Sequence, residues 1–194
     1  MLDKLSVPAL HDLYLRRQDG QLVQIDHLLR LPDSLMVIET KNLSGRLYGT
    51  ERQAKWTQMM GRRKFSMQNP LRQNYRQVET VRELYPASNP QGLVVMAGSA
   101  KFAKDKPNLV IMLKELHGYL SYLTDTTRDS RDPAFDEIWH EILSYQQSSQ
   151  QDALKAEHLQ QLKDRFGDDR RLQRGYVLML AGACCIGAGA AFLL

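Results

Sequence analysis

Apolar and polar positions in the N-terminal part of the chain predict three consecutive β-strands. Residues 10–15 form a first apolar run, and residues 22–31 form a second run after a turn that contains Asp and Gly. A break at residues 32–33, which are Pro and Asp, leads to a third run over residues 34–41. We therefore expect the second and third strands to pair around this break.

The middle of the chain shows a Gly-punctuated segment followed by a helix. Residues 42–56 are hairpin-like and end at Trp56, which we interpret as a packing anchor. Asn69 and Pro70 are typical of a helix start, with Asn as the N-cap and Pro in the first turn. The apolar spacing then predicts a helix that ends near Leu84.

A further strand and a long helix are predicted next. Residues 91–98 are a short apolar run bounded by turn residues, which indicates a buried strand. A helix is predicted to open at Asn108, and its apolar residues keep helical spacing as far as Leu123. This mixture predicts an α/β domain over residues 1–125, with a mixed central sheet flanked by helices.

The remainder of the chain is predicted to be a helical stalk and a membrane span. Residues 126–174 are polar and helical, with one apolar stripe that includes Phe135 and Trp139, so we interpret them as a stalk or linker. Residues 175–194 are an uncharged run of 20 residues. A helix of that length spans about 30 Å, which matches the core of a bilayer.

The sequence around this span also predicts its orientation. Three arginines precede it and no basic residue follows it, so the positive-inside rule predicts a single-pass protein with its N-terminal domain in the cytoplasm. Small residues recur at every fourth position, at Ala183, Gly187 and Ala191. That spacing permits close helix pairing in a membrane and hence a homodimer.

Composition and charge indicate a globular protein with a basic segment. The chain has 194 residues, of which 43% are hydrophobic and 25% are charged, and these values exclude wholesale disorder. Its two cysteines, Cys184 and Cys185, are adjacent and form no disulfide framework. Between Lys41 and Arg82 there are ten Lys or Arg and two acids, an excess of +8. Such a block attracts nucleic acid, although a solvated basic face has the same composition.

Three charged residues lie inside the apolar runs and suggest a catalytic site. Glu39 and Lys41 are two apart on one predicted strand, so both side chains leave the same face, and Asp26 lies on the preceding strand. A divalent cation such as Mg²⁺ or Mn²⁺ would offset the repulsion between two such carboxylates. It would also activate water for phosphodiester hydrolysis. The alternative is a structural ion pair between Glu39 and Lys41.

Several separate blocks resemble the nuclease-related domain family, a branch of the PD-(D/E)XK fold. They are QIDHLL with Asp26, VIETKN with Glu39 and Lys41, the GRLYG element, Trp56, and NPLRQN over residues 69–74. The blocks occur in the family's order and span roughly residues 10–123. The resemblance implies a restriction-endonuclease-like fold in which a mixed central sheet is flanked by helices.

The resemblance also implies roles for individual residues. Asp26 and Glu39 would be metal ligands together with the Thr40 carbonyl, Lys41 would be the active-site lysine, and Gln73 would border the site. A polar residue on a helix surface is an equal alternative for Gln73. The basic residues that flank the site would give non-specific, salt-sensitive binding to DNA or RNA; they are Arg62, Arg63, Lys64, Arg72 and Arg76.

These observations lead to one functional hypothesis and two rivals. We expect a membrane-anchored, metal-dependent nuclease-like protein that acts on DNA or RNA. The rivals are a catalytically weak or inactive nucleic-acid-binding module at the membrane, and a scaffold for a protein partner. In the family, a helix with a Gly-Glu pair precedes the first strand, and here only a short segment stands at that place. We therefore expect weak or absent cleavage, an internal start, and exposed apolar surface at Leu13 and Leu15.

Overall fold

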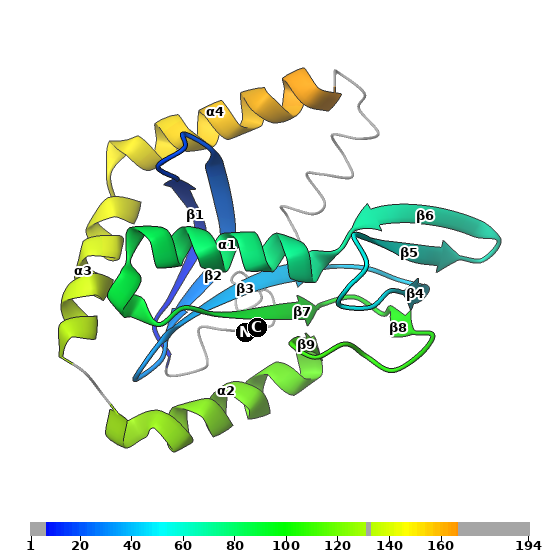
Figure 1. Cartoon of the computed structure of the whole chain (residues 1–194), viewed down its shortest axis with the longest axis horizontal. Coiled ribbons are helices and arrows are strands. Elements are labelled where there is room, and N and C mark those ends of the chain that lie inside the picture. The colour runs from blue at the N-terminus through cyan, green and yellow to red at the C-terminus, as the bar shows by residue number, and fades with distance from the viewer. Residues whose placement is uncertain (1–6, 131–132, 167–194) are drawn as a thin grey trace, which may run out of the picture.

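The computed structural model describes residues 7–130 and 133–166 and shows a mixed α/β domain (Figure 1). Sheet A has the strand order β1–β2–β3–β7–β9, and sheet B has the order β6–β5–β4–β8. The strands are β1 (Ala9–Arg16), β2 (Leu22–Arg30), β3 (Leu35–Lys41), β4 (Arg46–Tyr48), β5 (Lys55–Met60), β6 (Arg63–Gln68), β7 (Gln91–Met96), β8 (Lys101–Phe102) and β9 (Val110–Met112). The α-helices are α1 (Pro70–Leu84), α2 (Leu113–Thr127), α3 (Ala134–Gln146) and α4 (Ser149–Phe166).

Sheet A begins as an antiparallel meander and continues as parallel strands. Strands β1, β2 and β3 pair antiparallel, whereas β3, β7 and β9 pair in parallel. The predicted pairing of the second and third strands is confirmed, because His27 lies opposite Ile38 and the Leu31 amide donates to the Ser34 carbonyl at 2.9 Å. The α/β architecture with a mixed sheet and flanking helices is likewise confirmed.

Helices cover both faces of sheet A. On one face, Val37 packs with Val78 and Val81 of α1 and with Trp139 of α3. On the other face, side chains of β2, β3 and β7 pack against Leu116 and its neighbours on α2. Full burial of a large aliphatic side chain contributes about 1.5–3 kcal/mol, so these two layers hold the sheet rigidly between them.

The free edge of sheet A, at β1, is covered by glutamine side chains from the last two helices. Gln151 of α4 accepts from the Tyr14 amide and donates to the Tyr14 carbonyl, both at 2.9 Å. Gln146 of α3 donates to the His11 carbonyl at 2.9 Å. A side-chain amide has one donor and one acceptor group, so Gln151 satisfies the strand edge as a neighbouring strand would.

Helices α3 and α4 are packed on the domain, whereas a stalk would stand clear of it. The apolar stripe predicted from the sequence is buried, with Trp139 in the core beside Leu13 and Leu15. The expectation that Leu13 and Leu15 are exposed is wrong: their exposed fractions are 0% and 1%. Their burial follows from α3, which supplies the apolar surface that covers β1.

The segment before α2 differs from its prediction. The sequence predicts a helix from Asn108, but residues 110–112 form β9, the outermost parallel strand, and α2 begins at Leu113. Leu109 has a φ of 57°, in the left-handed region, so no helix can pass through it. Helical spacing alone could not reveal this strand, because a short apolar run fits either structure.

Sheet B is a curved extension beyond the end of β3, and the β5–β6 hairpin projects from it (Figure 1). Two glycines of the GRLYG element explain how it packs. A Cβ on Gly45 would lie 2.2 Å from the Met59 carbonyl oxygen, and one on Gly49 would lie 2.2 Å from the Trp56 ring. Trp56 is fully buried, which confirms it as a packing anchor.

The predicted membrane span falls outside the described part of the chain. Residues 175–194 belong to the segment that the structure does not describe. Within residues 7–130 and 133–166, no helix combines the length and the apolar character that a bilayer crossing requires.

Candidate active site

Helix α1 is fixed at its N-terminus, and this places its inner face over β3. The Asn69 side chain accepts from the Leu71 amide at 3.0 Å, and Pro70 occupies the first turn, as predicted. The Asn69 amide group also donates to three carbonyls in the loop after β4, the shortest of these bonds being 2.7 Å to Gln53. The cap therefore joins α1 to sheet B as well as starting the helix.

Strand β3 carries a buried ion pair toward α1. Glu39 and Lys41 are two apart on the strand, and their side chains meet on the same face. The Lys41 ammonium contacts Oε1 of Glu39, and the two residues are only 4% and 1% exposed respectively. Buried charges are tolerated when they are paired and when their remaining hydrogen-bonding groups are satisfied.

Two glutamines of α1 supply the remaining hydrogen bonds. Lys41 Nζ donates to Gln73 Oε1 at 3.0 Å, and Gln77 Nε2 donates to Glu39 Oε2 at 2.6 Å. Gln77 also donates to the Gln24 carbonyl at 3.0 Å, which ties it to β2. The helix therefore holds the carboxylate and the ammonium separately, each by its own amide, and fixes both rotamers.

Asp26 lies beside this pair, at the point where β2 and β3 separate. Their ladder ends at His27 and Ile38, and beyond it Asp26 Oδ2 accepts from the Thr40 amide at 2.9 Å. Burial and the neighbouring Glu39 carboxylate raise the pKa of Asp26 to about 8, although the Thr40 hydrogen bond and Lys41 oppose this shift. The buried Glu39 and the half-buried Asp26 thus share one site, in which each carboxyl group disfavours the other's ionisation.

The predicted core of the site therefore converges on one place. Asp26, Glu39, Lys41 and Gln73 come from β2, β3 and α1, and each contacts another member or the Thr40 backbone. Within the described residues, no group of three His, Cys, Asp or Glu side chains is arranged to hold a metal ion. A cation here would depend on two carboxylates and on main-chain oxygen such as the Thr40 carbonyl.

His27 lies on the opposite face from Asp26, as alternation predicts. Its ring is fully buried and its Nδ1 is 2.7 Å from Nδ1 of His11. Burial and the neighbouring His11 lower the pKa of His27 to about 3, so the ring is neutral at physiological pH. This pair belongs to the packing of β1 against β2 and not to the candidate site.

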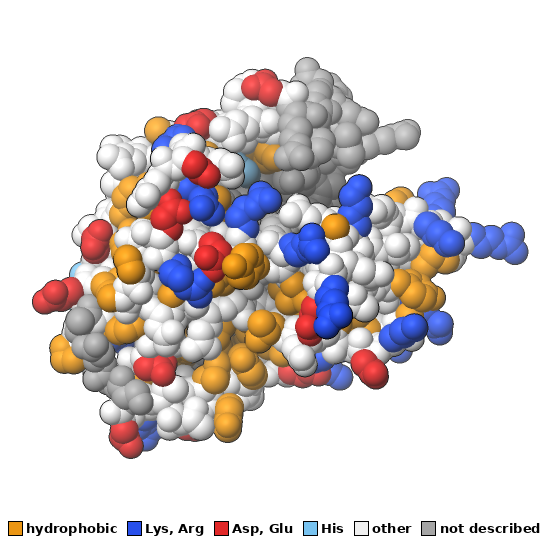
Figure 2. Space-filling view, viewed as in Figure 1, with side chains coloured by type: hydrophobic (Ala, Val, Ile, Leu, Met, Phe, Trp, Pro, Cys, Tyr) orange, Lys and Arg blue, Asp and Glu red, His pale blue; other side chains and the backbone are white. Residues whose placement is uncertain are grey.

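The predicted basic residues are all exposed, and none of them contacts Asp26 or Glu39 by a hydrogen bond or ion pair among the described residues. Arg62 lies in the tight turn of the β5–β6 hairpin, and Arg63 and Lys64 begin β6. Arg72 and Arg76 lie on the outer surface of α1, and Arg72 donates to the Arg52 carbonyl at 2.8 Å. Lys and Arg side chains gather on the β5–β6 side of the molecule (Figure 2).

Sequence reasoning missed Gln77, which completes the hydrogen bonding of Glu39. Its signal was available, because Gln77 follows Gln73 by four residues and therefore shares its helix face. Asn74 was also missed, although it is buried and donates to the Val37 carbonyl at 3.0 Å. In the sequence both residues look like ordinary polar positions on a helix surface. Their buried roles become evident only from the packing of α1 over β3.

Comparison with known proteins gives a partial match. Residues 2–97 match the family described as nuclease-related domain. A curated protein of Bacillus anthracis, described as uncharacterised, is 38% identical over 89 residues, which is 46% of this chain. The match covers 42% of that protein, so the chain spans less than half the length of this relative. No solved structure matches the chain.

Proposed function

Because residues 2–97 of the chain belong to the nuclease-related domain family, we propose that the protein is a nuclease that hydrolyses phosphodiester bonds of DNA or RNA. The observation that carries this proposal is the buried Glu39–Lys41 pair, which α1 clamps through Gln77 and Gln73, with Asp26 beside it. A purely structural ion pair would not need a second carboxyl group, the half-buried Asp26, which raises the cost of the Glu39 charge.

The donor set fits a hard divalent cation. Asp26 and Glu39 would supply carboxylate oxygens and the Thr40 carbonyl would supply a third oxygen, and Mg²⁺ or Mn²⁺ prefers such ligands. Burial and the neighbouring Glu39 carboxylate raise the pKa of Asp26, and a bound cation would oppose both causes by stabilising the ionised carboxylate. When bound, the cation would lower the pKa of a water molecule and offset negative charge on the phosphate.

The chain's own residues supply orientation and charge. Lys41 is held by Glu39 and Gln73, so its ammonium is positioned before any substrate arrives. A pre-positioned ammonium stabilises the negative charge that builds up on phosphate oxygens, without reorganisation during the reaction. Gln77 donates a hydrogen bond to one oxygen of Glu39 and thereby fixes the orientation of the carboxylate.

Cleavage by the purified full-length chain tests the proposal. The parent should cut DNA or RNA when Mg²⁺ or Mn²⁺ is present and should stop when EDTA is added. Glu39→Gln and Lys41→Met should reduce cleavage at least a hundredfold. Glu141→Gln and Lys155→Met are matched controls, since both side chains are exposed on α3 and α4. If all four variants and the parent cleave equally, the activity does not come from the Glu39–Lys41 site.

A second candidate is a nucleic-acid-binding module without turnover. The observation that favours it is that both oxygens of Glu39 are already engaged, one by Lys41 and one by Gln77. In this case Asp26→Asn should leave the affinity for nucleic acid nearly unchanged, whereas removing charge at Arg62, Arg63 and Lys64 should weaken binding and reduce its salt dependence.

Attachment to a membrane through residues 175–194 stays a prediction, with the domain on the cytoplasmic side. Full-length protein should sediment with membranes and resist a carbonate wash. A chain that ends at residue 167 should remain in the supernatant. Recovery of the full-length protein in the soluble fraction would contradict the prediction.

A further inference from the structure

The strands of sheet B carry positive charge and no negative charge. Strands β4, β5, β6 and β8 contain no Asp or Glu. Their cations are all exposed, and no ion pair among the described residues engages them; they are Arg46, Lys55, Arg63, Lys64 and Lys101. The strands of this sheet therefore contribute only positive charge to the surface, and Asp105 is an acid that lines the same hollow as Tyr48 and Lys55.

The strand register aligns three of these cations in one row. Arg46 of β4 lies opposite Lys101 of β8 on one side and opposite Met59 of β5 on the other. Met59 in turn lies opposite Lys64 of β6. Directly opposed side chains share a face of the sheet, and neighbouring strands are about 4.8 Å apart. The row from Lys101 to Lys64 is therefore about 14 Å long and crosses all four strands.

This row faces solvent because the other face of sheet B is the packed one. Leu47, Trp56 and Phe102 project from that other face into an apolar cluster shared with β7 and β9. Tyr48 is two residues after Arg46 on β4, so its ring lies on the same face as the cations, and it is 44% exposed. An aromatic ring thus lies beside the row of positive charges.

We propose that this surface, which we call the basic face, binds single-stranded nucleic acid and presents it to the candidate active site; it consists of Arg46, Tyr48, Lys55, Lys64 and Lys101. The inference rests on the proposed function and adds the substrate class to it. Cations bind phosphates of any nucleic acid, but an exposed aromatic ring beside them binds best to an unpaired base by stacking. A duplex would offer its phosphates to the row and leave Tyr48 without a partner.

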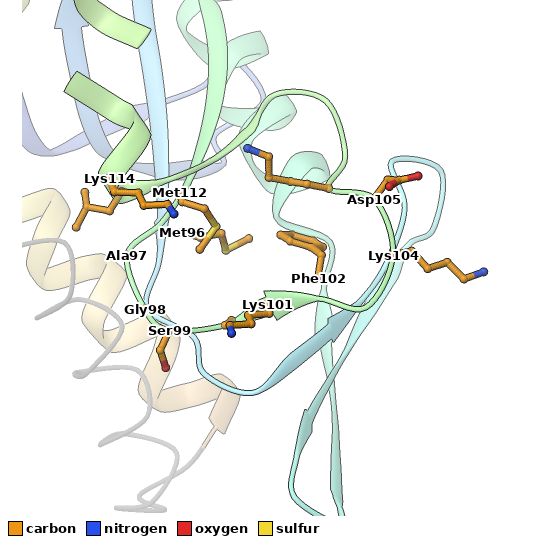
Figure 3. A pocket seen from close by; sticks show the side chains of 13 residues that line it. Met96, Ala97, Gly98, Ser99, Lys101, Phe102, Lys104, Asp105, Met112 and Lys114 are labelled. Carbon is orange, nitrogen blue, oxygen red and sulfur yellow. The ribbon is translucent and has the colours of Figure 1, made fainter. Parts of the chain in front are cut away.

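The basic face is linked through the backbone to the segment that follows the candidate-site strand β3. Arg46 follows Lys41 by five residues, and the Lys101 amide donates to the Gly45 carbonyl at 2.9 Å. Lys101 also borders a cavity of about 850 Å³ with Met96 on its wall (Figure 3). Met96 lies opposite Lys41 in the parallel β3–β7 pair. A nucleic-acid strand bound on the basic face would therefore lie beside a cavity that adjoins the end of β3.

The cavity itself has the character of a nucleotide site. Its apolar side chains include Met96, Phe102 and Met112 (Figure 3). Its lysines come from β8, from the loop after β8 and from α2, and they outnumber the single acid of the lining, Asp105; they are Lys101, Lys104, Lys106, which pairs with Glu115, and Lys114. Its volume lies in the range of ligand pockets, about 300–1,000 Å³. An apolar interior with a cationic rim suits a base and its phosphate together, which is consistent with an unpaired end of the strand.

Binding measured in EDTA tests the proposal separately from cleavage. The full-length chain is titrated into a fluorescent 20-nucleotide single strand and into the matching duplex, at two salt concentrations. We expect tighter binding to the single strand. Arg46→Gln, Lys64→Gln and Lys101→Gln combined should weaken it at least tenfold and flatten its salt dependence. Tyr48→Ala should weaken single-strand binding about fivefold or more and leave duplex binding unchanged.

A second triple variant controls for net charge. Arg128→Gln, just after α2, and Lys155→Gln and Lys163→Gln, on α4, remove the same charge from exposed positions and should change binding less than twofold. Equal weakening by both triple variants would overturn the proposal, as would tighter binding to the duplex with no effect of Tyr48→Ala. If the chain binds single-stranded nucleic acid as expected but does not cut it, only the proposed nuclease activity would be overturned. If the parent cuts nucleic acid but the basic-face substitutions leave binding unchanged, only the proposal about the basic face would be overturned.

Discussion

Gln77 of α1 donates a hydrogen bond of 2.6 Å to Glu39 of β3, in the buried interior between helix and sheet. The same Gln77 amide group donates to the Gln24 carbonyl of β2 at 3.0 Å. One side chain therefore connects the helix, the strand that carries Glu39 and Lys41, and the strand that carries Asp26. In the proposed reaction Gln77 is a positioning residue, since it acts through Glu39.

Replacing Gln77 with Met should reduce activity more than it reduces folding. Met has nearly the same size but cannot donate to Glu39, and loss of a partner that orients a metal ligand typically costs 10–100-fold in activity or metal affinity. The free energy of unfolding should fall by about 1–3 kcal/mol, the cost of a buried group without its partner. Kinetics and urea unfolding measure the two effects. Unchanged kcat in a stably folded variant would contradict the positioning role.

The Glu39–Lys41 pair should show strong thermodynamic coupling. Glu39→Gln or Lys41→Met alone leaves the other charge buried without its counterion, which costs about 3–5 kcal/mol of unfolding free energy. Combining the two changes should cost clearly less than the sum of the single changes. Chemical denaturation of the parent and the three variants completes the cycle, and simple additivity would show that the pair is not energetically linked.

Metal affinity should depend on pH through Asp26. Burial and Glu39 raise its pKa to about 8, so the metal-free protein carries a proton on Asp26 at neutral pH. A cation binds the ionised carboxylate and displaces that proton, so Mn²⁺ affinity should rise about tenfold per pH unit below about pH 8 and then level off. Calorimetry at pH 6, 7, 8 and 9 measures this. Asp26→Asn should abolish the slope, and a parent affinity independent of pH would contradict the prediction.

Stability should fall in acid because His27 is buried in its neutral form. Its pKa of about 3 in the folded state lies below the ordinary value of about 6.5, so between these values the unfolded chain binds more protons. The free energy of unfolding therefore decreases as the pH falls from 6.5 toward 3. The drop in Tm between pH 7.5 and 5 should be smaller in His27→Leu than in the parent. Equal drops would show that His27 is not responsible.

Gln151 should matter more to stability than its exposed neighbour. Gln151→Ala removes the partners of the Tyr14 amide and carbonyl, both buried under α4, and should cost about 2–4 kcal/mol of unfolding free energy. Gln150→Ala is the matched control, because Gln150 is exposed on the same helix and should change stability by less than about 0.5 kcal/mol. Equal effects would mean that Gln151 contributes only its helical propensity.

The sequence predicted features whose cause is local. Asn69 and Pro70 start α1 because a cap and a Pro act within one turn, and two-residue spacing was enough to place Glu39 and Lys41 on one face. Features that depend on distant partners were not predictable. The apolar stripe of α3 identified a buried face but not β1 as its partner, and the exposed, polar β6 has no apolar pattern that would reveal a strand.

The glutamines that cover β1 also have a consequence for synthesis and assembly. Tyr14 and Gln151 are 137 positions apart, so a nascent chain exposes the open backbone of β1 until nearly the whole domain has been made. An unpaired strand edge is a template for pairing with a second chain. Chaperone protection during translation should therefore benefit this protein, and chains that lack α4 should tend to aggregate through β1.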